Sequence, residues 1–216
     1  MPALSQPRHA PHDRRSRRRA ETRERIFRAA MSLFAERGMA ATTVEDITEL
    51  ADVGKGTFFN YFPTKEHVLN ALGEIQLGNL AAALEDARDG TDPIAEVLQR
   101  LARALAREPG RSPALVRSLM MAHLSNDAVR ERVVDVLGQG RGILAQILRI
   151  GQERGEVRRE ADPLVLARIF QQTMFGTMLF WSMHPGAPLP EWISQTIGHY
   201  CASIPAEGRS RAGRRP

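Results

Sequence analysis

A dense cluster of arginines lies near the start of the chain, in the run Arg14-Arg-Ser-Arg-Arg-Arg19. Guanidinium groups at this density can neutralise neighbouring phosphates and release the counterions that surround a nucleic acid. A solvated tail that only keeps the chain soluble would have the same composition. The rest of the sequence must decide between these two interpretations.

The positive charge of the chain is concentrated at its ends. The formal net charge is +5 over 216 residues. Residues 1–19 hold six arginines and one acid, and residues 206–216 hold four arginines and one acid. The body between them is slightly acidic, with 20 basic and 23 acidic side chains. Attraction to nucleic acid is therefore predicted for the arginine arm and not for the folded body.

Signatures of catalysis or metal binding are weak. The sequence has no phosphate-binding loop, no Cys–His motif and no carboxylate pair at a recognisable spacing. A single cysteine, Cys201, rules out an internal disulfide and fits the reducing cytoplasm. His123, His184 and His199 lack metal-ligand spacing, so we expect neither metal nor cofactor. An enzyme that uses Cys201 or a histidine as nucleophile or base is the minor alternative.

Helical periodicity runs through the body and predicts an all-α fold. Ile26, Ala29, Ala30, Leu33 and Phe34 form one apolar face of a helix that ends before Gly38. Later helices are predicted from their capping residues. One is capped by Thr64 and runs from Lys65 to about Arg88, and others open at Asp92-Pro93, Ser112-Pro113, Asn126 and Asp162-Pro163. The most apolar stretch, residues 164–183, contains Arg168 and two glutamines, which favours a buried helix over a membrane span.

Two short helices joined by a tight turn are predicted between Thr43 and Lys65. Thr42 and Thr43 are suitable N-caps, and each has an acid three residues later. Asp52-Val53-Gly54 breaks the period, and the second helix must stop before Pro63. This is a helix-turn-helix pattern, although an ordinary helical hairpin would give the same periodicity.

The motif from Thr43 to Leu69 resembles the motif of one known family. The spacing Thr-x-x-x-Ile-x-x-x-Ala-x-Val-x-x-Gly-Thr-x-x-x-Tyr-Phe-x-x-Lys-Glu-x-x-Leu resembles the DNA-binding domain of the tetracycline-repressor (TetR) family, as does the preceding Leu33-Phe-Ala-Glu-Arg-Gly38. The resemblance implies a homodimeric regulator, more often a repressor than an activator, that a small molecule releases from a palindromic operator. A nonspecific DNA-binding protein driven by the arm is the alternative.

The resemblance also implies a domain organisation. Residues 1–18 would form a disordered basic arm and residues 19–79 the helix-turn-helix DNA-binding domain. Residues 80–205 would form a helical effector-binding and dimerisation domain, followed by a disordered basic tail over residues 206–216. The last two helices of the effector-binding domain would make the dimer interface. The contacts would come from Ile193, Ile197, Cys201 and Ile204, and Gly176 would allow close approach.

Individual DNA contacts follow from the resemblance and from side-chain chemistry. Lys55 and Asn60 are suited to base edges, whereas Thr43, Thr57, Tyr61 and Lys65 are suited to phosphates. Phe59 stands where the family usually has a tyrosine, and Asp52 replaces the usual turn glycine. The predicted DNA-binding residues are Thr43, Val53, Gly54, Lys55, Gly56, Thr57, Phe59, Asn60, Tyr61 and Lys65, with Arg17, Arg18 and Arg19 of the arm.

A set of aromatic and methionine side chains in the second half predicts a pocket. Such soft, adaptable side chains suit a lipophilic ligand, although simple core packing would use the same residues. The predicted lining is Met120, Met121, His123, Phe170, Gln171, Met174, Phe175, Met178 and Trp181.

Overall fold

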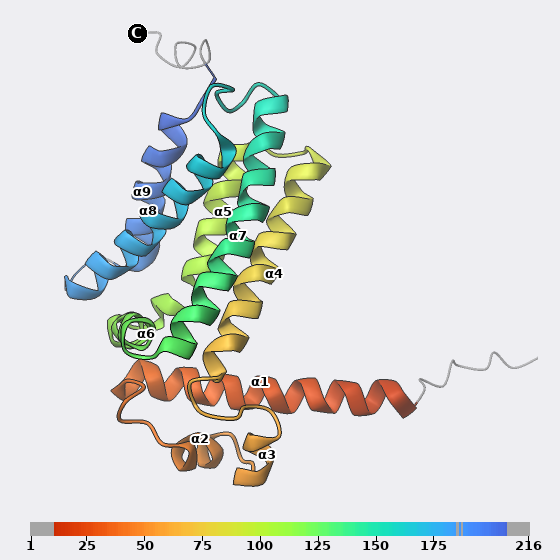
Figure 1. Ribbon diagram of the computed structural model, residues 1–216, viewed down its shortest axis with the longest axis vertical. Helices are drawn as coiled ribbons and strands as arrows, with labels where there is room; N and C mark the ends of the chain where they lie inside the picture. Colours follow the sequence, from red (N-terminus) through yellow and green to blue (C-terminus); the bar gives the residue numbers. More distant parts are fainter. Residues whose placement is uncertain (1–10, 185, 187, 207–216) are drawn as a thin grey trace, which may run out of the picture.

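The computed structural model describes residues 11–184, 186 and 188–206, and its described part is all-α, as predicted (Figure 1). An isolated bridge between Val157 and Pro205 is the only extended pairing in that part of the chain. No helix in these ranges is both long and apolar enough to cross a membrane. The elements are α1 (Pro11–Arg37), α2 (Val44–Leu50), α3 (Lys55–Phe59), α4 (Val68–Asp89), α5 (Ile94–Ala106), the 3-10 helix η1 (Pro109–Arg111), α6 (Pro113–Ser125), α7 (Asp127–Glu153), α8 (Pro163–Met183) and α9 (Leu189–Ser203).

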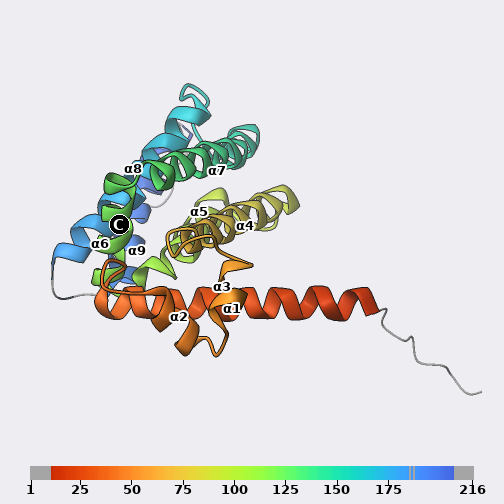
Figure 2. The ribbon, with the colours of Figure 1, turned by 60° about the horizontal axis from the view of Figure 1, so that its bottom comes forward.

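Helix α1 is the platform on which α2 and α3 pack (Figures 1 and 2). The core beneath them is aromatic and aliphatic, with Phe34, Ile47 and Phe58 fully buried. The same core extends into the start of α4 through Val68 and into α6 through Leu115 and Leu119. The helix-turn-helix unit is therefore built on helices that belong by sequence to both halves of the chain.

Helices α4, α5, α7, α8 and α9 enclose the second core. Helix α4 connects the two cores, because Leu69 and Leu72 belong to the first and Leu80 and Leu84 to the second. Helices α4 and α7 run side by side (Figure 1). Gly140 permits this approach, because a Cβ there would come within 2.9 Å of the Leu80 side chain.

The basic arm is partly helical, so the expectation of disorder over residues 1–18 is wrong for residues 11–18. Helix α1 already begins at Pro11, where a proline is compatible with a first helical turn. Arginine has a high helix propensity, and the Arg17 guanidinium pairs with the Glu21 carboxylate four residues later at 3.0 Å. Residues 1–10 and 207–216 lie outside the described residues.

Most predicted helix starts are confirmed, and two are displaced. Thr43, Ser112, Asn126 and Asp162 accept backbone N–H groups as N-caps. Helix α4 starts at Val68 instead of Lys65. The backbone N–H groups of residues 67–70 each donate to the carbonyl three residues earlier, which gives turns in place of the first α-helical turn. Helix α5 takes Pro93 as its N-cap instead of Asp92.

The apolar stripe of α9 does not form a free surface. Ile193, Ile197 and Ile204 are buried within their own chain, where α9 packs against α5 and α8. The exposed apolar stripe lies on α8 instead. It comprises Val165, Ile169, Leu179, Phe180 and Met183, with open space beside Gly176.

Candidate DNA-binding surface and ligand cavity

The start of α2 is fixed by a capping box. The Asp46 N–H donates to the Thr43 hydroxyl at 3.1 Å, while the Thr43 N–H and hydroxyl donate to the Asp46 carboxylate at 2.8 and 2.6 Å. The Arg37 guanidinium pairs with the same carboxylate at 2.8 Å. These hydrogen bonds from Thr43, helped by Arg37, lower the pKa of Asp46 to about 2. The Thr43 hydroxyl, predicted to contact a phosphate, is thus already used within the protein.

The turn and α3 present the predicted recognition residues to solvent. Asp52 adopts a left-handed conformation with φ of 50°, as expected for the residue that replaces a turn glycine. Gly54, Lys55, Gly56, Phe59 and Asn60 are exposed. Phe58 is buried below them, and Val53, Thr57 and Tyr61 are half-buried. The exposed face of α3 therefore carries an ammonium, an amide and an aromatic ring.

An acidic partner faces the lysine at the start of α3. The Lys55 ammonium forms an ion pair with the Glu45 carboxylate of α2, and this hydrogen bond lowers the pKa of Glu45. Both side chains are more than half exposed, so the pair is weak in water. Among the described residues the Thr57 and Asn60 side chains have no hydrogen-bond partner, which leaves both available to DNA.

The Lys65 ammonium, predicted to contact a phosphate, is hydrogen-bonded within the protein. The ammonium donates to the carbonyl oxygens of Met39 and Thr42, each at 2.8 Å, and more weakly to that of Ala40 at 3.5 Å. The side chain is therefore directed into the loop between α1 and α2.

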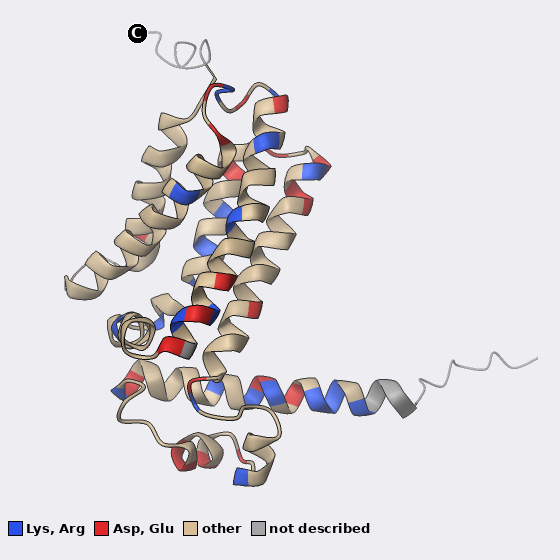
Figure 3. Ribbon diagram, viewed as in Figure 1, with Lys and Arg blue, Asp and Glu red and all other residues tan. Residues whose placement is uncertain are grey.

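The arginine arm continues α1 away from the folded body. In Figure 3 many of the positions on this part of α1 are Lys or Arg, whereas α2 carries acidic residues. Arg19 lies over the Tyr61 ring, 5.8 Å from its centroid, and Arg23 lies over Phe62 at 5.5 Å. These contacts bring the base of the arm next to the end of the helix-turn-helix. Arg17 and Arg18 are exposed.

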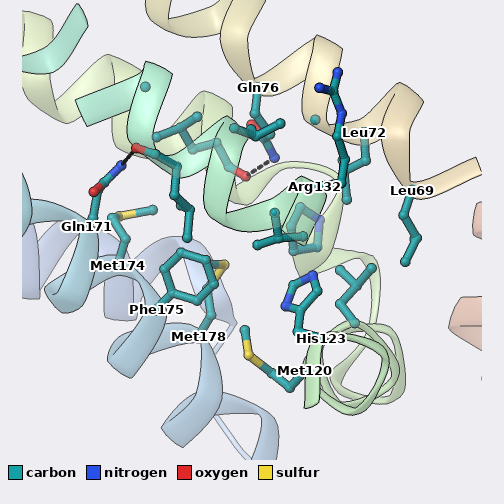
Figure 4. Close-up of a pocket in the computed structure, with 18 of the residues that line it drawn as sticks. Leu69, Leu72, Gln76, Met120, His123, Arg132, Gln171, Met174, Phe175 and Met178 are labelled. Carbon is teal, nitrogen blue, oxygen red and sulfur yellow. Dashed lines mark hydrogen bonds between the residues drawn. The ribbon is translucent and has the colours of Figure 1, made fainter. Parts of the chain in front are cut away.

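A cavity of about 160 Å³ lies between α4, α6, α7 and α8 (Figure 4). Its lining is almost entirely apolar and includes seven of the nine predicted residues: Met120, His123, Phe170, Gln171, Met174, Phe175 and Met178. The volume is on the order of ten times what a single ordered water needs. Along α7 the lining runs from Val129 to Leu144, which is roughly 22 Å at 1.5 Å per residue. The cavity is thus elongated.

Few polar groups face the cavity, and most are already paired. The Gln171 amide donates to the Leu137 carbonyl at 2.8 Å, and the Gln76 amide donates to the Leu105 carbonyl at 3.0 Å (Figure 4). The Arg132 guanidinium pairs with Asp135 at 2.9 Å. The His123 imidazole has no partner among the described residues, and burial lowers its pKa. His123 is consequently neutral at pH 7 and can donate or accept one hydrogen bond.

Two predicted lining residues lie outside the cavity, and several were missed. Met121 is 61% exposed on the outer side of α6, and Trp181 is packed into the C-terminal core. The prediction drew on the methionine- and aromatic-rich stretches and so overlooked α4 and α7. These helices contribute residues that include Leu69, Leu72, Gly73, Gln76, Arg132, Val133, Val136, Leu137 and Gly140. The glycines inside both helices were the sequence signal that could have indicated this wall.

Comparison with known families matches both halves of the chain. The profile described as "Bacterial regulatory proteins, tetR family" matches residues 26–72, and the profile described as "Tetracyclin repressor-like, C-terminal domain" matches residues 78–197. The chain belongs to the tetR family. It is a DNA-binding transcriptional repressor of the helix-turn-helix type and not an enzyme.

Curated relatives and solved structures agree with this assignment. The repressor KstR2 of Mycobacterium tuberculosis is 28% identical over 193 residues, which cover 88% of this chain and 94% of KstR2. The repressor KstR of Rhodococcus jostii is 28% identical over 171 residues, covering 78% of this chain and 76% of KstR. The crystal structure of Thermus thermophilus FadR in complex with lauroyl-CoA is 30% identical with a TM-score of 0.60, and the match covers 90% of this chain and 97% of FadR.

The environment of Cys201 also argues against the alternative of a nucleophilic enzyme. The thiol is half-buried against the Ala95 carbonyl at 3.8 Å. Burial raises the pKa of Cys201 to about 11, so the reactive thiolate is scarce at neutral pH. Within the described residues no group of three or more histidine, cysteine or acidic side chains could hold a metal ion.

Proposed function

We propose that this tetR-family repressor binds a near-palindromic operator as a homodimer and leaves it when a lipophilic effector with an aliphatic chain enters the cavity. The observation that carries the proposal is that the cavity shares its wall with the DNA-binding core. Leu69, Leu72, Leu119 and Val129 line the cavity and also pack against the core of the helix-turn-helix unit. A ligand that moves these residues therefore moves α4 and α6 against α1.

Two hydrogen bonds strengthen this coupling between α6 and α1. The Ser112 hydroxyl donates to the Ala35 carbonyl at 2.8 Å, and the Met39 N–H donates to the Ser118 hydroxyl at 3.4 Å. Both bonds attach α6 to the end of α1, next to the loop that leads into α2. Displacement of α6 by an effector would therefore change the position of the DNA-binding unit in each protomer.

The chemistry of the cavity supports an effector whose buried part is uncharged. Among the described residues of the lining, Arg132 is the one permanent cation, and it is already paired with Asp135. Most of the remaining lining offers apolar contacts along an elongated space. The neutral His123 imidazole would bind a single polar group, such as a carbonyl, near the end of α6. An acyl chain meets these conditions, and the similar FadR of Thermus thermophilus was crystallised with lauroyl-CoA.

The exposed stripe on α8 supports the homodimer. Val165, Ile169, Phe180 and Met183 lie on one helical face and are 38–57% exposed. Gly176 lies on the same face with open space in front of it, so a second helix can approach closely. A two-fold dimer through this face would present two α3 helices to DNA, with half-sites about 34 Å apart along the duplex.

In the proposed complex, α3 is the specificity element and the arm supplies nonspecific affinity. Asn60 and Lys55 would reach base edges, and Phe59 and Gly56 would allow apolar contact and close approach in the major groove. Val53, Gly54, Thr57 and Tyr61 would lie at its margin. Arg17, Arg18 and Arg19 would contact phosphates, because the body over residues 20–66 carries six basic and eight acidic side chains and offers little attraction of its own.

Operator selection from a random duplex library, using the full-length protein, tests the DNA-binding part of the proposal. A palindromic consensus with half-sites about one helical turn apart is the expected result. Recovery of sequences without a common motif would instead support nonspecific binding through the arm. Deleting residues 1–18 should weaken binding to selected and random duplexes alike and should reduce its salt dependence.

Titration with lauroyl-CoA, free CoA and lauric acid against the operator complex tests the effector part. Lauroyl-CoA or lauric acid should release the operator, whereas free CoA should not. Replacing Phe175 by tryptophan fills the cavity and should weaken ligand binding at least about tenfold while sparing operator affinity. Met121→Trp, on the outer side of α6, is the matched control. Release by free CoA alone would contradict an effector held by its aliphatic part.

A further inference from the structure

Lys65 has a complete set of hydrogen-bond acceptors inside the protein. A lysine ammonium has three N–H donors, and here the carbonyl oxygens of Met39, Thr42 and Ala40 lie at 2.8, 2.8 and 3.5 Å. The matching position of the family motif was predicted to contact a phosphate. A phosphate contact in this arrangement would require Lys65 to give up acceptors that it already has.

The loop held by Lys65 is buried and depends on such contacts. Thr42 is fully buried, and its hydroxyl donates to the Gly38 carbonyl at 2.8 Å. Its carbonyl accepts from Lys65, and a buried carbonyl without a donor is strongly unfavourable. The next residue, Thr43, is the N-cap of α2. The lysine therefore fixes the backbone directly before the capping box.

The position of Lys65 in the chain makes this contact a link between elements. It lies just before α4, whose Leu69 and Leu72 line the cavity, and it binds the residues that connect α1 to α2. We infer that Lys65 is a positioning residue of the DNA-binding unit: its ammonium clamps the α1–α2 loop to the start of α4, and it makes no phosphate contact in the operator complex. This inference rests on the DNA-binding function of the chain.

The salt dependence of operator binding separates positioning from phosphate contact. Each lost phosphate contact lowers the slope of log Kd against log salt by about 0.9, so one lost contact per protomer, which is two per dimer, lowers it by about 1.8. Lys65→Met should weaken operator binding about tenfold, lower the melting temperature and leave the slope unchanged, and Lys65→Arg should recover part of the affinity. Arg18→Met, at an exposed arginine that is proposed to contact a phosphate, is the control and should lower the slope by about 1.8.

Chemical labelling tests the same inference on the unsubstituted chain. The sequence contains two lysines, Lys55 and Lys65, so competitive acetylation read by peptide mass spectrometry reports each one separately. Without DNA, Lys65 should react at least about tenfold more slowly than Lys55, because its donors are occupied. Adding operator should protect Lys55 and leave the Lys65 rate unchanged.

Two outcomes would overturn the inference. One is a slope that falls by about 1.8 in Lys65→Met without a change in melting temperature. The other is that both lysines are acetylated at equal rates in the free protein and that Lys65 becomes protected when DNA is added. If the unsubstituted chain failed to bind any selected operator, the proposed function would be wrong. That result is distinct from the two outcomes that contradict the role of Lys65.

Discussion

The DNA-binding unit and the ligand cavity are built in opposite ways. In the first, α2 and α3 are too short to be stable alone, and named polar contacts hold them: the Thr43–Asp46 capping box, the Arg37–Asp46 ion pair and the Lys65 clamp. In the second, long helices pack through apolar side chains around an open space, and polar groups are few.

The DNA-binding unit holds its side chains in fixed positions, whereas the cavity wall can adapt its shape. A unit that reads base edges needs side chains held in one arrangement, because hydrogen bonds to bases depend on direction. The proposed lipophilic ligand needs complementary volume and soft side chains, and the cavity offers Met120, Met174 and Met178. The two regions should therefore respond differently to loss of volume, to pH and to loss of single hydrogen bonds.

Loss of one phenyl ring should have the largest effect and should differ between the regions. Phe58 is fully buried against Phe59 and Phe62, so Phe58→Ala should lower the free energy of unfolding by about 3–5 kcal/mol. Phe175 faces a cavity and is half-buried, so Phe175→Ala should cost only about 1 kcal/mol. Urea unfolding followed by circular dichroism measures both. Equal losses would mean that the cavity is packed as tightly as the first core.

A mildly acidic pH should destabilise the cavity region through His123. Burial lowers the pKa of His123 below its ordinary value of 6.5, so the unfolded chain takes up the proton first as pH falls. The contribution of this residue is present above pH 6.5 and is lost below it. Urea midpoints at pH 7.5, 6.5 and 5.5 should fall in the wild type and be flatter in His123→Asn. The exposed His199→Asn should keep the wild-type trend, and loss of the trend there would remove His123 as its cause.

The sequence predicted the DNA-binding unit in detail because short-range rules determine it. The Thr43 cap, the left-handed Asp52 and the stop at Gly38 follow from neighbours within a few residues. Long-range polar contacts were not predictable. The binding of Lys65 to the Met39 carbonyl and the pairing of Lys55 with Glu45 join residues that meet only after folding.

The cavity was predictable in kind but not in outline. The methionine and aromatic residues of α6 and α8 predicted a soft lining, and seven of nine named residues are there. Composition does not say which face of a helix points inward when its neighbours are unknown, so exposed Met121 and buried Trp181 were included. The same uncertainty placed the dimer stripe on α9, whose isoleucines are covered by α5 and α8.

Removal of the α2 cap should have a smaller effect confined to the DNA-binding unit. Thr43→Ala should cost about 1 kcal/mol of stability, the usual value for an N-cap.

The stabilising contribution of Asp46 is present above its ordinary pKa of 3.8 and is lost as pH falls through about 2. Asp46→Asn should therefore reduce the loss of stability between pH 4 and pH 2 and leave the trend between pH 7.5 and 5.5 intact. A change in that upper window would show that the two regions do not titrate separately.

The smallest expected effect tests whether the polar contacts of the DNA-binding unit all stabilise its function. The Glu45 carboxylate pairs with Lys55, the exposed cation of α3, and places a negative charge close to the DNA. Both partners are exposed, so the pair contributes little to stability. Glu45→Gln removes that charge and leaves the Lys55 ammonium available to a base or phosphate, and operator affinity should rise about two- to fivefold, in keeping with a weak surface pair. Fluorescence anisotropy with a labelled operator measures this, and Glu49→Gln on the same helix is the control for charge alone. An equal gain in both variants would assign the effect to net charge. A loss of affinity in Glu45→Gln would instead show that Glu45 orients Lys55 for reading DNA. The Glu45–Lys55 ion pair would then be a positioning contact, like the capping box and the Lys65 clamp.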